Sequence, residues 1–390
     1  MATTIPRREV LAGAGALLMG GLLGGCGADR LRPAGMSRPM LELPPLRARP
    51  DRITRITVCT RPFRADGPRI EAERIGDKTV VHNYGHGGSG WSLSWGSGAL
   101  AVELAMATGE RDIAVIGCGA IGLTTATLLQ RAGARVTIYA KDLPPNVRSS
   151  LATGTWTPDS RVCLQDRLTP AFKARWQSMT RRSFEAYQTL LGLPGTPVEF
   201  FDFYFVSDEP AAERPPPAAD GRPRFAVLQR ELVPELLPRM EEFAPGEHNL
   251  GARRLRRTSS LLFNLVAYSH LLLSDFVANG GRIEVTEFHT PGDLARLRER
   301  TIVHATGYGA RALFSDQSIV PVRGQLARTA PEPGIDFGCV YRNVAFVPRR
   351  DGFVFQSLGE DEYYGYGDDS TTPDRAEAER AVATINSIYA

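Results

Sequence analysis

Hydrophobic positions along this chain follow strand spacing in some stretches and helical spacing in others. The apolar run at 113–116 predicts a short buried strand, and helical spacing continues from there to Gly133, a residue typical of a helix C-cap. A second strand is predicted at 135–140. A strand, a helix and another strand in this order indicate a parallel sheet with helices packed on its faces.

The middle and late parts of the chain carry further periodic stretches. Helices are predicted at 169–191 and 261–279, and strands at 198–206 and 282–286. The proline-rich stretch 208–223 is predicted to be an exposed loop. Alternating units at both ends and a strand-rich middle predict an α/β protein with a Rossmann-like nucleotide-binding domain and a second, antiparallel-sheet substrate domain.

The first residues have the pattern of a bacterial export signal. Arg7 and Arg8 precede an apolar run at 10–23, and Cys26 follows it. The arginine pair resembles a twin-arginine signal, which export machinery for folded proteins reads, and the residues before Cys26 resemble a lipobox. We therefore expect 1–26 to be an export signal and the mature protein to be periplasmic or on the cell surface, anchored to the membrane if Cys26 is lipidated. The alternatives are a plain secretory signal or a short membrane anchor, although the run is short and glycine-rich for a spanning helix.

Composition narrows the class of protein. The chain has 390 residues, of which 43% are hydrophobic, and this is enough for one large or two moderate domains. The net charge of +3 comes from both signs spread along the sequence, and no basic block is interleaved with aromatic residues, so nucleic acid is not an expected partner. The cysteines after the signal are scattered and form no CxxC pair, which indicates neither a zinc site nor a disulfide framework. They are Cys59, Cys118, Cys163 and Cys339.

The residues after the strand at 113–116 have the glycine spacing of a dinucleotide-binding turn. Gly117 permits a tight turn, Gly119 lets the backbone approach a pyrophosphate, and Gly122 lets the helix pack closely on the strand. The helix N-terminus then faces the phosphates. An acid beyond the second strand, Asp142, stands at about the right distance to bond a ribose hydroxyl. Either Asp142 serves with an offset of one residue, or backbone groups hold the ribose. The predicted cofactor-binding residues here are Gly117, Gly119, Ala120, Ile121, Gly122 and Asp142.

A later strand indicates which of two dinucleotide cofactors, FAD or NAD, the sequence favours. Residues 300–304 predict a strand that runs into Ala305, Thr306 and Gly307. In many FAD proteins with such a nucleotide domain, a late strand ends in this way and returns the chain to the flavin site, whereas a nicotinamide domain has no need of it. The sequence therefore favours FAD, with Thr306 and Gly307 beside it.

Five segments together resemble the D-amino-acid oxidase family. Residues 115–158 are similar to the family's first part, and 301–325 to its strand-ATG segment and following RGQ strand. Residues 340–348 resemble the active-site strand that begins with a tyrosine. Residues 61–74 resemble the segment whose first arginine grips the substrate carboxylate, and 80–96 resemble the loop that wraps the flavin. The resemblance covers most of the chain after about residue 41.

The order of these segments is rotated relative to the family. Residues 41–106 hold what is usually the C-terminal quarter, and 111–390 hold the rest, joined by the short polar link 106–112. This resembles a circular permutation, which folds allow when the original ends lie close together at the surface. We expect Leu41 and Ala390, near the new ends, to be neighbours in space.

The resemblance also implies how the chain divides. We expect a tether at 27–40, an FAD-binding domain formed mainly by 41–159 and 259–325, and a substrate domain formed mainly by 160–258 and 326–390. The segment 160–258 has the weakest pattern.

The resemblance implies oxidation of D-amino acids to 2-oxo acids, ammonium and hydrogen peroxide, with hydride transfer to FAD. Arg61 would fork onto the substrate carboxylate, and Tyr341 would cover the site and bond the same carboxylate. We expect Arg61 and Tyr341 to converge over one pocket. The family's second tyrosine is replaced here by Ala345, so the pocket is larger or another hydroxyl serves instead. The candidates are Tyr204, Tyr268 and Tyr308.

Two further groups of residues are implied to hold the flavin. The glycine-rich loop would present backbone and hydroxyl groups to the isoalloxazine, where donors stabilise developing charge. The serines after the AKDLPP turn would bond the pyrophosphate. These residues are Gly87, Gly88, Gly90, Ser92, Ser149 and Ser150. The histidines in the loop, His82 and His86, are interpreted as structural.

Other functions stay open. One is a related amine oxidoreductase, such as a glycine, sarcosine or D-aspartate oxidase, or a dehydrogenase that passes electrons to a quinone instead of oxygen. The other is a catalytically silent, flavin-binding lipoprotein. Arg61 favours an enzyme, because a degenerate site has little reason to keep a carboxylate-binding fork.

Overall fold

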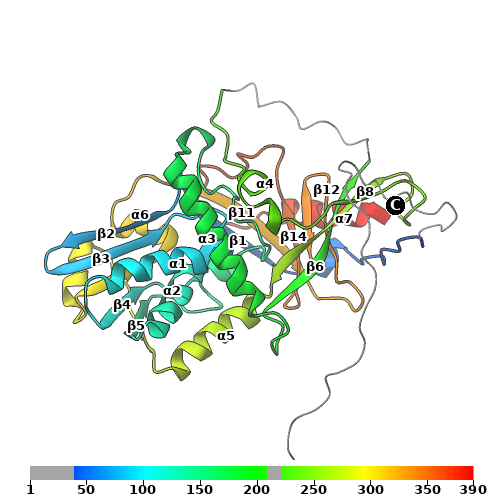
Figure 1. The fold of residues 1–390 in the computed structure, drawn as a ribbon. Helices are drawn as coiled ribbons and strands as arrows, with labels where there is room; N and C mark the ends of the chain where they lie inside the picture. Colours follow the sequence, from blue (N-terminus) through cyan, green and yellow to red (C-terminus); the bar gives the residue numbers. More distant parts are fainter. Residues whose placement is uncertain (1–38, 209–220, 390) are drawn as a thin grey trace, which may run out of the picture. The chain divides into compact units, whose positions relative to one another are not determined.

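Two β-sheets organise the chain in a computed structural model, which describes residues 39–208 and 221–389 (Figure 1). The predicted export signal at 1–26, with Cys26, and nearly all of the tether lie outside the described residues, so export and lipidation stay predictions. Within the described residues, no helix is long and apolar enough to cross a membrane.

The first sheet has six strands and is mainly parallel. Its antiparallel edge strand, β2, forms a hairpin with β3, and every other pairing is parallel. The predicted strands at 113–116, 135–140 and 300–304 are confirmed as the inner strands β4, β5 and β10. In spatial order the strands are β2 (Arg69–Ile75), β3 (Lys78–Tyr84), β10 (Thr301–His304), β4 (Asp112–Ile116), β5 (Arg135–Ala140) and β9 (Arg282–Val285).

Helices cover one face of this sheet. Figure 1 shows α1 and α2 side by side, with α5 beyond α2 and α3 across α1. Apolar residues of these helices share one core with the sheet residues Val81, Val115, Ile138 and Val303. The opposite face packs against residues 286–297. The helices are α1 (Gly90–Met106), α2 (Ala120–Arg131), α3 (Pro170–Gln188) and α5 (Leu265–Ala278).

The second sheet has eight strands, and all its pairings are antiparallel except that between β12 and β6. The helix α7 (Arg375–Asn386) covers one face of it. Two short helices, α4 (Gln229–Leu232) and α6 (Ala310–Leu313), lie in connections. In spatial order the strands are β1 (Ile53–Arg64), β11 (Ile319–Thr329), β14 (Phe353–Ser357), β13 (Val344–Val347), β12 (Gly338–Tyr341), β6 (Val198–Ser207), β8 (Arg254–Phe263) and β7 (Glu241–Phe243).

One predicted element is partly wrong. The stretch 261–279 was expected to be a single helix, but residues 261–263 continue β8 and pair with 198–200 of β6. The helix α5 begins only at Leu265. Pairing with β6 decides the conformation of these three residues, because tertiary pairing overrides helical spacing at a boundary.

The two strands β1 and β11 lie in the eight-stranded sheet although their residues fall in the predicted FAD-binding segments. They pair with each other from Ile53 and Thr329 to Arg64 and Ile319. Each strand is continuous in sequence with the six-stranded sheet, because β1 leads into β2 and β11 follows β10. The chain therefore passes between the two sheets at this pair.

Residues close to the two expected ends of the rotated chain lie together. The hydroxyl of Tyr389 donates a hydrogen bond of 3.0 Å to the carbonyl of Pro44. Leu43, Leu46 and Ile388 share one buried cluster. The expectation itself named Ala390, which lies outside the described residues.

We predict that Gly96→Ala lowers the free energy of unfolding by about 1–3 kcal/mol, because overpacking against backbone cannot relax easily. Gly96 lies in α1 where α3 crosses it, and a Cβ atom there would stand 2.1 Å from the carbonyl oxygen of Met179. The measurement is urea unfolding followed by circular dichroism. Gly90→Ala in the same helix is the control, since a Cβ there meets nothing within 4 Å. Equal stability of the two variants would contradict the close crossing.

Candidate active site

Four parallel strands end at one edge of the six-stranded sheet. The registers align His304 and Ile116, the last residues of β10 and β4, with His82 of β3, which continues to Tyr84, and β5 runs beside β4. The predicted ligand loops follow directly: the glycine-rich loop after β3, Ala305–Gly307 after β10, and Gly117–Gly119 after β4. Ligands of open α/β sheets bind outside the carboxyl ends of the strands, so this edge is the candidate cofactor site.

Two glycines of the dinucleotide turn lie so close to backbone atoms that a side chain does not fit there. Gly117 has φ +110°, and a Cβ on it would lie 2.5 Å from the carbonyl oxygen of Ala305. A Cβ on Gly122 would lie 1.9 Å from the carbonyl oxygen of Gly117. This close approach brings the Thr306–Gly307 segment beside the start of α2, as the sequence predicts.

The serines after β5 reach the same helix end. Ser149 Oγ accepts a 3.0 Å hydrogen bond from the backbone N–H of Ala120, and it lies 3.0 Å from where a Cβ on Gly119 would be. Ser150 is buried, and its hydroxyl has no partner among the described residues. Ile121 follows in the first turn of α2. A pyrophosphate is bound by groups such as the positive N-terminus of a helix, a close glycine turn and a buried hydroxyl without a partner. All three occur here, so the residues present fit a dinucleotide.

The predicted ribose ligand has no further support. Asp142 is exposed just beyond β5, and the neighbouring Lys141 pairs with Glu287 at 3.1 Å. Its role stays a prediction.

The glycine-rich loop does not offer the donors that were expected of it. The N–H of Gly87 donates to the carbonyl of Pro62, and that of Gly88 donates to the carbonyl of Ser160, both at 2.9 Å. A Cβ on Gly87 would lie 1.9 Å from the carbonyl oxygen of Arg161. These two glycines therefore serve close packing against Ser160 and Arg161, and their N–H groups are not free for a flavin.

The start of α1 supplies the donors instead. The first helical hydrogen bond runs from Leu93 to Ser89, so the N–H groups of Gly90, Trp91 and Ser92 have no helical acceptor. The hydroxyl of Ser92 is not free, because it accepts a 2.8 Å bond from the N–H of Thr157. The expected contribution of Gly90 and Ser92 is thus limited to backbone N–H groups at the positive end of a 17-residue helix.

Arg61 lies on β1 with its guanidinium folded over β11. Its Nη1 donates 3.1 Å to the carbonyl of Arg323, and a Cβ on Gly324 would lie 2.6 Å from Nη1 and 2.8 Å from Cζ. Only glycine at position 324 leaves room for this arrangement. Among the described residues, no carboxylate lies within ion-pair distance of Arg61.

The same sheet face continues toward the cofactor edge. Alternation places Leu326 on the face of Arg61. Continuing the β11–β14 register by one residue brings Leu326 level with Gln356, which pairs with Ala345 of β13. Gln356 accepts a 2.5 Å hydrogen bond from the hydroxyl of Thr153, which lies shortly after Ser149 and Ser150 in the chain. Arg61, Gly324, Gln356 and Ala345 thus form a row on four adjacent strands, which we call the Arg61 face. Gln356 and Thr153 carried no sequence signal that singled them out.

Tyr341 does not belong to this site, which corrects the expectation that it converges with Arg61. It is buried in the core under α7, on the opposite face of the eight-stranded sheet, and β12 lies four strands, about 19 Å, from β1. Its hydroxyl donates to both carboxylate oxygens of Asp208, at 2.9 and 3.0 Å. The strand alternation that turns Ala345 toward the Arg61 face turns Tyr341 away from it.

Of the other tyrosines considered, one lies near the cofactor edge. Tyr204 is buried in the core under α7, and Tyr268 is buried among α1, α3 and α5, where it accepts from Trp95. Tyr308 directly follows Gly307, with the guanidinium of Arg148 5.0 Å from its ring centroid. Tyr308 is therefore the remaining hydroxyl candidate.

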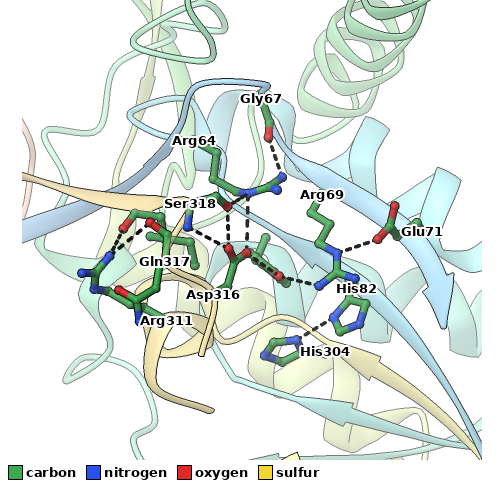
Figure 2. Close-up of polar contacts among 12 residues, drawn as sticks. Arg64, Gly67, Arg69, Glu71, His82, His304, Arg311, Asp316, Gln317 and Ser318 are labelled. Atoms are coloured by element: carbon green, nitrogen blue, oxygen red, sulfur yellow. Dashed lines mark hydrogen bonds and ion pairs between the residues drawn. The ribbon is translucent and has the colours of Figure 1, made fainter. Parts of the chain in front are cut away.

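A buried histidine pair connects the surface to the ATG segment. His304, the last residue of β10, pairs with His82 of β3. Their Nδ1 atoms lie 3.0 Å apart, and Figure 2 marks this contact with a dashed line. His82 Nε2 lies 2.9 Å from the carboxylate of Glu73, and His304 Nε2 lies 2.6 Å from Thr306 Oγ1. His82 lies in β3 rather than in the loop where it was expected, and its ring contacts the side chains of Glu73 and His304. His304 was assigned no role. The matching segments VVH at 80–82 and IVH at 302–304 were the signal that could have paired them.

The carboxylate fixes the direction of this chain of hydrogen bonds. Because Glu73 only accepts, His82 Nε2 carries the proton, and a neutral His82 then accepts at Nδ1 from His304 Nδ1–H. His304 Nε2 in turn accepts from the hydroxyl of Thr306. Thr306 is left with only lone pairs to offer to the cofactor edge.

We predict that the histidine pair makes the fold sensitive to acid. Burial lowers the pKa of His82, and burial together with the charge of His82 lowers that of His304 well below its usual value. The unfolded chain binds protons at these groups below about pH 6.5, so their stabilisation is complete above that pH and is lost as the pH falls toward the folded pKa values. His304→Asn should reduce the loss of unfolding free energy between pH 7.5 and 5.0 by about 1–2 kcal/mol, measured by urea unfolding.

A variant of an exposed histidine, His270→Asn, is the control for this experiment. It should keep the pH dependence of the parent protein. Identical pH dependence in His304→Asn and the parent would contradict the assignment of the effect to the buried pair.

Comparisons with known proteins identify the family of this chain. Residues 112–390 match the family described as DAO, FAD dependent oxidoreductase. The D-amino-acid oxidase of Rubrobacter xylanophilus is 29% identical over 270 residues, 68% of this chain and 73% of that protein. The D-amino-acid oxidase of Dictyostelium discoideum is 26% identical over 287 residues, 72% of this chain and 74% of that protein. Among solved structures, iminodiacetate oxidase from Chelativorans sp. BNC1 is 16% identical, with a TM-score of 0.48 over 71% of this chain and 78% of that chain.

Members of this family use FAD, and the glycine cradle, the two helix ends and the serines described above fit it. Because the match extends over most of the sequence, the chain belongs to the DAO family of FAD-dependent oxidoreductases.

Proposed function

We propose that this protein oxidises D-amino acids. The overall reaction converts a D-amino acid, oxygen and water into a 2-oxo acid, ammonium and hydrogen peroxide. The observation that carries the proposal is Arg61, a half-buried guanidinium that has no carboxylate partner among the described residues and lies over Gly324. A guanidinium in this position can take a substrate carboxylate through two parallel, charge-assisted hydrogen bonds.

The residues around Arg61 would orient the substrate. The guanidinium of Arg61 donates a hydrogen bond to the Arg323 carbonyl and packs on Gly324. These two contacts restrict it to one side of the sheet. A substrate held there lies on the face shared with Ala345 and Gln356. Positioning of this kind is the main contribution that a protein makes when a cofactor carries the chemistry.

FAD, when bound, supplies the hydride acceptor for oxidation of the Cα–H bond. The chain's own part is electrostatic: the N–H groups of Gly90, Trp91 and Ser92 at the positive end of α1 would stabilise negative charge on a bound flavin. Trp91 also donates 2.8 Å from Nε1 to the carbonyl of Ser149, which ties this helix end to the serine segment. No side-chain base is required if the substrate amine is already neutral.

The proposal includes a rotated order of segments. It is supported by the family match, which begins at residue 112, and by the contributions of 53–106 to both sheets. Residues 78–84 form β3 in the middle of the parallel sheet, and 53–64 form β1, so the segment before the match is integral to the fold. The proximity of Tyr389 to Pro44 agrees with ends that lie together.

Arg61→Met tests the proposed function. We expect kcat/KM for D-amino acids to fall by roughly a hundredfold or more, because two hydrogen bonds to a charged group are lost. Binding of FAD, measured by flavin fluorescence, should not change. The activity measurement is anaerobic bleaching of the flavin by a mixture of D-amino acids, with the L-mixture beside it.

The control is Arg55→Met, which removes an exposed arginine from the same strand and the same side of it. It should keep the parent's activity. A flavin that stays oxidised with every D-amino acid would overturn the proposal, and would leave a different amine substrate or a silent flavoprotein. Bleaching that depends on D-amino acids but not on Arg61 would overturn the assignment of the carboxylate site.

A further inference from the structure

A second arginine, Arg161, lies near Arg61 and has no acidic partner among the described residues. Arg161 belongs to the segment against which the glycine-rich loop packs: Gly87 donates to the carbonyl of Pro62, next to Arg61, and its Cα abuts the carbonyl of Arg161. Arg161 has φ +48°, a conformation that non-glycine residues rarely adopt and that tends to mark functional positions. The backbone therefore places Arg161 against the residues that carry Arg61.

The side chain of Arg161 is held over aromatic rings. Its Nε donates 3.1 Å to the carbonyl of Glu362, and its guanidinium carbon lies 5.7 Å from the ring centroid of Phe225. Phe225 contacts Phe63 at 5.1 Å between ring centroids, and alternation along β1 places Phe63 on the same side as Arg61. The guanidinium groups of Arg61 and Arg161 thus lie near the same two aromatic rings, those of Phe63 and Phe225.

Within the part of the chain that the structure describes, no acidic side chain neutralises this pair. Among the described residues, none with a carboxylate lies within ion-pair distance of Arg61 or Arg161. The nearest acids, Asp361 and Glu362, are taken by Arg222 at 2.6 Å and Arg224 at 3.6 Å. Burial and the charge of Arg61 lower the pKa of Arg161 to about 10, although both acids act in the opposite direction. Two close positive charges out of water are unfavourable unless an anion joins them.

We propose that Arg161 binds a second anionic group of the substrate, so that the preferred substrates are dicarboxylic D-amino acids. This inference rests on the proposed function of Arg61 as the ligand of the α-carboxylate. Arg61 takes that carboxylate and Arg161 takes the carboxylate of the side chain.

The test compares two unreactive acids of equal length, succinate and butyrate, on the FAD-loaded protein by isothermal titration calorimetry. We expect succinate to bind roughly ten- to a hundredfold more tightly, since the second carboxylate gains charge-assisted hydrogen bonds. Arg161→Met should remove this preference, and Arg161→Lys should keep part of it. Methionine meets the same backbone strain as arginine at φ +48°, so the comparison isolates the charge.

The matched control is Arg167→Met, which removes the same charge from an exposed position six residues further on. It should keep the preference for succinate. Equal binding of both acids to the parent protein would overturn the proposal. So would an Arg161→Met variant that weakens succinate and butyrate equally, or one that loses FAD and leaves succinate unchanged, because Arg161 would then serve the cofactor.

Anaerobic bleaching with D-aspartate and D-alanine separates this inference from the function it rests on. Bleaching by D-alanine but not by D-aspartate, without a preference for succinate, overturns the dicarboxylate class and leaves D-amino-acid oxidation standing. No bleaching by either, with succinate still preferred and dependent on Arg161, overturns the oxidation of D-amino acids and leaves the second anion site standing.

Discussion

The pairing of β1 with β11 is the constraint on which both candidate sites depend. Each strand joins the parallel sheet directly, since β1 leads into β2 and β11 follows β10. The register between them places Arg61 opposite Val322 and leaves its guanidinium over Gly324. The pairing of β1 with β11 therefore also sets the position of the Arg61 face relative to the candidate cofactor site. A slip of one residue would turn Arg61 to the face covered by α7, because side chains alternate along a strand.

The glycine-rich loop shows why composition alone assigns a role imperfectly. Gly87 and Gly88 are required, but by their close packing on Ser160 and Arg161 rather than by a flat ligand. Hydrogen bonds from Gly87 and Gly88 tie the loop between β1 and the segment after the serines. The loop thus fixes three things at once: the start of α1, the position of Arg161 and the approach of both to Arg61. Its contribution to a flavin is indirect, apart from the free N–H groups that begin the helix.

How far the sequence predicted the site follows from how local each feature is. Gly117, Gly122 and the ATG segment depend on neighbours in the chain, so their spacing was sufficient. The face occupied by Tyr341 depends on the register of β12 against β13 and on burial beneath α7, neither of which a nine-residue resemblance contains. Arg161 comes from the segment without a recognisable pattern, and only its packing against Gly87 reveals it. The fold was predictable because strand, turn and helix signals repeat, whereas the choice of side chains at the site was set by long-range packing.

The unpaired charges near Arg61 also link the ligand to the stability of the fold. A guanidinium that is partly removed from water and faces another positive charge destabilises the folded state, and proteins keep such arrangements mainly where a ligand relieves them. An anion that joins Arg61 and Arg161 restores the missing interaction only in the folded protein, and so stabilises it by mass action. Binding and folding are then coupled through the same two side chains. This coupling is stronger for an acid with two carboxylates than for one, since a single carboxylate leaves one guanidinium uncompensated.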